Sequence, residues 1–101
     1  MTVKKMRVSW AGRFGNVSGA DMPTRLLVRD TDDDPKWDAI RRAVKRHTRL
    51  SVVGARWDST SLEDGAPSAH HYELTLGTFL RRGGASIEGS LWLTLPVEAP
   101  R

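Results

Sequence analysis

The chain has 101 residues, enough for one modest hydrophobic core. Its 39% hydrophobic and 28% charged residues are ordinary for a soluble globular protein, and no apolar run approaches the roughly 20 residues of a membrane-spanning helix. The absence of cysteine excludes disulfides, thiolate metal sites and cysteine nucleophiles. No apolar region follows the two N-terminal lysines as in a signal peptide, so we expect a cytoplasmic protein with one domain over residues 1–101.

The N-terminal third predicts two strands separated by a loop. The first covers residues 4–10, where Met6, Val8 and Trp10 lie on one side. Residues 11–23 contain three glycines and are expected to form a loop, after which residues 24–29 predict a second, short strand.

Residues 35–47 predict the helix of this domain. Asp33 or Asp34 is expected to cap its start and Pro35 suits its first turn, while cationic residues gather at its negative end. Apolar and aromatic residues three or four apart predict the buried stripe of this helix: Trp37, Ile40, Val44 and His47.

Residues 49–58 predict a third strand, and residues 59–68 predict a polar, mobile connection. A hairpin follows, in which Gly83 and Gly84 are expected to form a two-residue turn. Facing residues would then have numbers that sum to 167, as in Leu74 with Leu93. The order β-β-α-β-β-β predicts an α+β fold, a single domain with one helix packed on a largely antiparallel sheet.

The positive charge is concentrated in the predicted helix. Residues 36–49 contain six cationic side chains and one acidic one, whereas the whole chain has a net charge of +4. Such a row suits a phosphate backbone, although a solvated helix face would also account for it. The residues expected to contact nucleic acid are Arg41, Arg42, Lys45, Arg46 and Arg49, with support from Lys4, Lys5, Arg81 and Arg82.

The face of the predicted hairpin that points away from the helix is a second candidate binding surface. Phe79 and Trp92 would project away from the helix, where aromatic side chains can anchor a protein partner or stack on a base. Burial of both side chains beneath the N-terminal strands or the long loop of residues 59–68 is the alternative. With Arg81 and Arg82 at the turn, these residues form the candidate interface for a protein partner or a second copy of the chain.

The remaining motifs predict neither a metal site nor a catalytic site. The acidic run of residues 30–34 lacks the glycine and the glutamate of a calcium loop, so it is interpreted as helix capping. His70 and His71 would point to opposite faces of a strand and are expected to bind no shared ion. No phosphate-binding loop, dinucleotide fingerprint or serine elbow is present.

The sequence therefore predicts a small binding module with no catalytic residues, metal or cofactor, rather than an enzyme. Nucleic-acid contact through the basic helix is the leading hypothesis. The alternative is a protein-interaction or assembly subunit, such as an adaptor or an inhibitor encoded by a mobile element, that uses the Phe79 and Trp92 face or a sheet edge. Neither hypothesis involves a membrane, and a homo-oligomer fits both.

Overall fold

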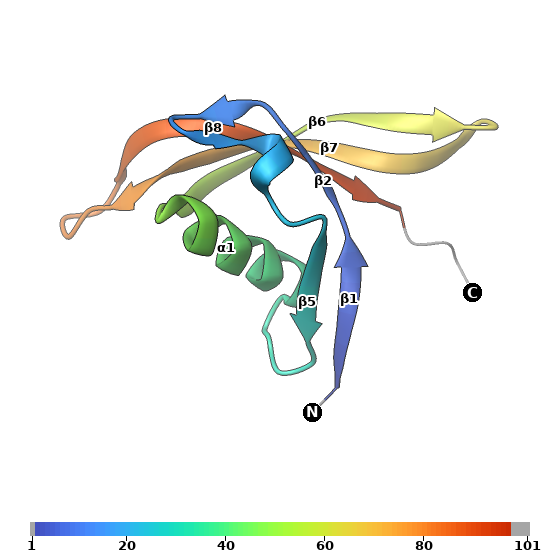
Figure 1. Cartoon of the computed structure of the whole chain (residues 1–101), viewed down its shortest axis with the longest axis horizontal. Helices are drawn as coiled ribbons and strands as arrows, with labels where there is room; N and C mark the ends of the chain where they lie inside the picture. The colour runs from blue at the N-terminus through green and yellow to red at the C-terminus, as the bar shows by residue number, and fades with distance from the viewer. Residues whose placement is uncertain (1, 98–101) are drawn as a thin grey trace.

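The computed structural model describes residues 2–97 and has two layers (Figure 1). A sheet forms one layer, and a single α-helix lies beneath it beside a two-stranded ribbon. The elements are β1 (Val3–Arg7), β2 (Ser9–Ala11), β3 (Arg13–Phe14), β4 (Val17–Ser18), the 3-10 helix η1 (Gly19–Asp21), β5 (Arg25–Arg29), α1 (Pro35–Thr48), β6 (Ser51–Glu63), β7 (Ala66–Phe79) and β8 (Ala85–Pro96).

The strands form one main sheet and two small ribbons, and the pairings are antiparallel. The main sheet has the order β2-β8-β7-β6, while β1 pairs with β5 and β3 pairs with β4. The predicted α+β architecture, one helix on a largely antiparallel sheet, is therefore confirmed. The strand expected over residues 4–10 is divided at Val8, whose N–H donates to the carbonyl of Thr24, so that its two parts join different sheets.

The helix begins and ends close to the predicted residues. Asp34 occupies the N-cap position, but its side chain makes no capping bond. Instead, its backbone N–H donates to the Asp38 carboxylate at 3.2 Å, which satisfies one of the amides left open at a helix start. At the other end Arg49 has a left-handed backbone (φ 64°), and its N–H donates to the carbonyl of Lys45.

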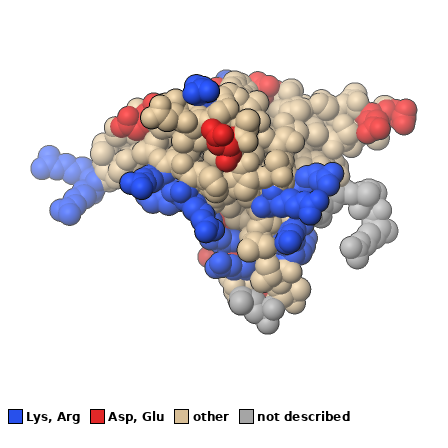
Figure 2. All heavy atoms as spheres, viewed as in Figure 1, with Lys and Arg blue, Asp and Glu red and all other residues tan. Residues whose placement is uncertain are grey.

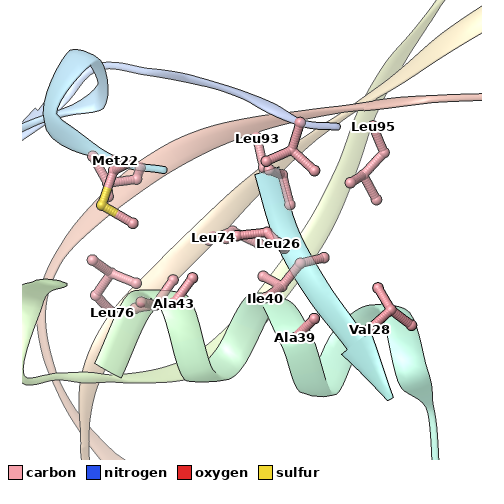
Figure 3. Packing of buried hydrophobic residues seen from close by; sticks show 13 residues of the cluster. Met22, Leu26, Val28, Ala39, Ile40, Ala43, Leu74, Leu76, Leu93 and Leu95 are labelled. Carbon is pink, nitrogen blue, oxygen red and sulfur yellow. The ribbon is translucent and has the colours of Figure 1, made fainter. Parts of the chain in front are cut away.

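The hydrophobic core lies between α1, β5 and the main sheet (Figure 3). Ile40 and Val44 are fully buried, as predicted, whereas Trp37 is half-buried and packs edge-on against Tyr72, with ring centroids 5.2 Å apart. The prediction for His47 was wrong, because this residue is exposed at the end of the helix. The sheet contributes the buried leucines Leu74, Leu76, Leu91, Leu93 and Leu95.

The β7–β8 hairpin exists, but its predicted register was wrong. Leu74 pairs with Leu91 rather than with Leu93, and the turn contains five residues, 80–84, instead of two. A shift of two residues leaves each leucine on the same face of the sheet, which explains why the buried face was predicted correctly. A bulge between Leu76 and Gly77 then shifts the pairing by one further residue.

The segment expected to be a mobile connection, residues 59–68, belongs to a second long hairpin. Strands β6 and β7 continue through it and are joined by Asp64 and Gly65, which both have positive φ (53° and 80°). Its polar composition follows from exposure on both faces, because this part of the hairpin extends beyond the helix (Figure 1).

Candidate nucleic-acid interface

Arg42 joins the helix to the segment before it. Its guanidinium donates to both carboxylate oxygens of Asp32, at 3.0 and 2.8 Å, and to the carbonyl of Leu27 at 3.1 Å. The hydrogen bond from Arg42 lowers the pKa of Asp32 from its ordinary value of 3.8, and the same contact raises the pKa of Arg42. Arg42 was predicted to contact nucleic acid, but its side chain is already committed to a bidentate ion pair within the fold.

Arg41 is half-exposed and makes an ion pair with Asp38, one turn earlier on the helix. The hydrogen bond from Arg41 is the largest cause of the lowered pKa of Asp38. Because Arg41 makes only this exposed contact, its guanidinium can exchange the carboxylate for a phosphate at little cost.

Lys45, Arg46 and Arg49 are exposed at the C-terminal end of α1. Among the described residues, no salt bridge joins any of them to a carboxylate. Arg49 does not continue the helical row as expected, because the left-handed backbone at this position turns the chain away from the helix axis. At this end of the helix, the cations without a carboxylate partner among the described residues are therefore Lys45 and Arg46, with Arg49 beside them.

A surface hollow of about 480 Å³ adjoins Arg41 and Lys45, and we call it the helix hollow. Phe79 lies in its wall with its side chain largely in solvent, at 64% exposure. Phe79 was expected to project away from the helix, yet it lines this hollow together with Arg41 and Lys45 of α1. Strand β6 begins at Ser51, directly after α1, and pairs there with Gly77 of β7. The hollow is lined by Arg41, Arg42, Lys45, Ser51, Val52 and Phe79.

The positive charge extends beyond the helix. Figure 2 shows Lys and Arg side chains along the lower side of the view, over α1 and over the β1–β5 ribbon, with a further group at the free end of the β7–β8 hairpin. Arg81 and Arg82 are exposed in the turn of that hairpin. The carboxylates visible in this view lie mainly on the sheet layer and at the end of the β6–β7 hairpin. Five further aspartates, at residues 30–38, belong to the segment before α1 and to its first turn. One side of the molecule is thus more cationic than the net charge of +4 suggests.

Trp92 does not line the helix hollow. It is half-buried in β8, between Ala11 of β2 and Glu73 of β7, and the segment around Gly12 passes close to its ring. Phe79 and Trp92 therefore do not form one continuous surface as expected. From the sequence Trp57 could join either face of the sheet, because Val52 and Val53 leave the register of that strand open. In the structure it is an edge-strand residue with 57% exposure.

The two histidines connect strands. His70 Nδ1 lies 2.8 Å from the hydroxyl of Thr60, and His71 bridges Ser61 of β6 and Thr94 of β8 at 2.6 and 2.9 Å. Within residues 2–97, no three histidine, aspartate or glutamate side chains gather closely enough to hold a metal ion.

The same residues include no helix with the length and apolar character that a bilayer crossing requires. Comparisons of the chain with protein-family models, with curated proteins and with solved structures gave no match.

Proposed function

We propose that the protein is a non-catalytic module that binds nucleic acid through the C-terminal half of α1 and the helix hollow. The observation that carries this proposal is the position of an exposed aromatic ring, Phe79, beside Arg41 and Lys45. Single-strand binding proteins combine these two features, because cations hold the phosphates while an aromatic face stacks on a base. The partner in this proposal is single-stranded DNA or RNA.

The ionic part of the site is formed by side chains that the fold leaves available. Lys45 and Arg46 have no carboxylate partner among the described residues, and Arg41 has an exposed one. Neither Asn nor Gln lines the hollow, and the proposal assigns its available cations, Arg41 and Lys45, to phosphate contacts. Binding should therefore depend strongly on salt and weakly on sequence.

The test is fluorescence anisotropy with labelled single-stranded DNA, duplex DNA and RNA at several salt concentrations. The logarithm of affinity should fall linearly with the logarithm of salt, by about 0.7 for each phosphate contacted on a single strand. Lys45→Glu combined with Arg46→Glu should make this slope shallower and weaken binding at every salt concentration. Arg13→Glu with Arg56→Glu is the matched control, because it removes the same charge from exposed positions on β3 and β6.

Phe79→Ala tests the stacking contribution separately. Since the ring is exposed, its removal should leave the fold stable while weakening single-strand binding by about 1–3 kcal/mol. Duplex DNA, whose bases are already stacked, should respond much less. No binding at low salt, or equal losses in the helix variant and its control, would refute the proposal.

A second candidate function, a protein-interaction or assembly subunit, is favoured by a different observation. Large apolar side chains are exposed along the main sheet, away from the core: Phe79 (64%), Leu80 (51%) and Ile87 (69%) near the β7–β8 turn, Trp57 (57%) midway along β6, and Leu62 (66%) near the β6–β7 turn. Exposed apolar groups of this kind often belong to interfaces.

A further inference from the structure

The tip of the β6–β7 hairpin, residues 62–67, extends beyond the rest of the sheet. Strand β8 ends at Pro96, opposite Ala69, so the tip has only two strands. Each residue in it is exposed, and Figure 1 shows the hairpin projecting from the body of the molecule. A two-stranded ribbon without a covering layer gains little stability of its own. A tip of this kind is suited to contact another surface.

The chemistry of the tip is distinctive. Leu62 is 66% exposed, and it is followed by the carboxylates of Glu63 and Asp64. In the part of the chain that the structure describes, neither carboxylate forms a salt bridge. Figure 2 shows acidic side chains at the end of this hairpin without cations around them. The tip therefore presents one apolar side chain and two negative charges on a tight turn.

A surface groove of about 720 Å³ elsewhere on the chain has the opposite character. It lies between the β1–β5 ribbon and the end of β8. Its accessible apolar lining consists of Met6, Pro35, Pro96 and Val97, beside the buried Val28 and Leu95. Its charged lining is more cationic than acidic, and consists of Lys4, Lys5, Arg7 and Lys36 with Asp30 and Asp34. We call it the ribbon groove.

We propose that the tip of one copy of the chain docks in the ribbon groove of a second copy. Leu62 would pack on the apolar walls, while Glu63 and Asp64 would approach Lys5, Arg7 and Lys36. The tip cannot enter the groove of its own chain, because the pairing of β6 and β7 directs it away from the body. This interaction goes beyond nucleic-acid binding and uses different residues.

Such a contact joins two different surfaces of the chain. Two copies can exchange their tips reciprocally as a closed dimer, and copies joined head to tail form a ring or an open filament. Because the tip is small, each single contact is weak, and closure of a ring would strengthen it. Opposite charges on the two surfaces should also make assembly sensitive to salt.

Strand addition at the free edge of β6 is a less suitable route to assembly. The pairing of β6 with β7 shifts register at Val52/Gly54, Trp57/Ser59 and Ser61/Leu62. Such irregularities twist and interrupt an edge, so that it offers no long regular ladder to a second strand.

Sedimentation velocity with two charge-reversed variants tests the proposal. One carries Glu63→Lys and Asp64→Lys, and the other carries Lys5→Glu and Lys36→Glu. The natural chain should associate with rising concentration at low salt, and each variant alone should associate about tenfold more weakly or worse. An equimolar mixture of the two should regain association, because native tip meets native groove and reversed tip meets reversed groove.

The control for the tip variant is Asp33→Lys with Glu88→Lys, which makes the same charge change at exposed positions outside the tip. A monomeric natural chain, variants that associate normally, or a mixture that stays monomeric would each overturn the proposal. Circular dichroism confirms that the variants are folded. Anisotropy with nucleic acid reports separately on the proposed function, which the tip variant should leave unchanged.

Directed cross-linking provides a second test, since the chain contains no cysteine. Asp64→Cys and Lys5→Cys are introduced into separate proteins of different tag length, which are then mixed under mild oxidation. A disulfide between the two different proteins should form faster than either homodimer. Equal rates for all three products would contradict docking of the tip in the groove.

Discussion

Gly89 of β8 lies directly against the ring of Phe14 in β3. A Cβ atom at this position would be 3.2 Å from Cγ of the ring and would overlap with Cδ2 and Cε2. Gly77, on the neighbouring strand β7, has a different obstacle, because a Cβ atom there would overlap with the backbone carbonyl of Ser86 and lie 2.9 Å from its carbon. We predict that alanine at either position lowers the free energy of unfolding. Truncation of Phe14 should remove this cost at Gly89 but not at Gly77.

The free-energy cost of each substitution depends on which group the new Cβ atom must displace. Phe14 is a half-buried side chain on a short hairpin and can rotate away, so Gly89→Ala should cost about 1–2 kcal/mol, in the lower part of the range for overpacking. The obstacle at Gly77 is main chain within the β7–β8 pairing. Gly77→Ala should therefore cost about 3 kcal/mol or more, since relief requires the hairpin to open at its bulge.

Urea unfolding followed by the fluorescence of the four tryptophans measures these free energies. In a Phe14→Ala background the cost of Gly89→Ala should fall almost to zero, which corresponds to a coupling energy of about 1–2 kcal/mol. The cost of Gly77→Ala should stay the same in that background. Equal costs for Gly89→Ala with and without the ring, or rescue of Gly77→Ala, would show that the packing and register described above are wrong.

Three further outcomes are expected. Ile40→Ala removes a side chain with no exposure from the centre of the core and should lower the free energy of unfolding by about 2–5 kcal/mol in the same urea assay; a loss below about 1 kcal/mol would contradict this packing. Arg42→Gln should destabilise the protein because it removes the ion pair with Asp32, yet it should leave the salt slope of nucleic-acid binding unchanged, whereas Lys45→Gln should make that slope shallower. Because the folded pKa of Asp32 lies below 3.8, its carboxylate stabilises the fold above that pH and this stabilisation disappears as the pH falls through the folded pKa. The melting temperature should thus fall in acid, and Asp32→Asn should reduce the fall without abolishing it, since the pKa of Asp38 is lowered too; an unchanged acid profile would count against the Asp32–Arg42 contact.

Local patterns were sufficient for several parts of the fold. The helix over Pro35–Thr48 could be predicted because its start, its apolar spacing and its cationic end all belong to one continuous segment. The buried face of β7 and β8 could be predicted because alternating leucines identify a face whatever the exact pairing. Asp64-Gly65 was a missed signal, since this dipeptide commonly forms a two-residue hairpin turn.

The candidate site depended more on tertiary structure. The sequence identified the cations of α1, but it could not distinguish Arg42, which pairs with an aspartate ten residues earlier, from Lys45 and Arg46, which have no such partner among the described residues. That difference depends on how the segment before the helix folds back on it. The cations of the helix therefore divide into one that is paired within the fold, Arg42, and others that remain available to a ligand, Lys45 and Arg46.

By itself the sequence determined the fold class, the helix and the apolar face of the sheet, because these depend on periodicity and on local backbone preferences. Only the tertiary structure decided where Phe79 lies and which surfaces the two hairpins present. Phe79 lies between a bulge and a five-residue turn and lines one hollow with α1 and the start of β6, an arrangement that the residues nearest to Phe79 in the chain do not require. Strand register depends on packing across the whole sheet, so this part of the site could be seen only after the chain was folded.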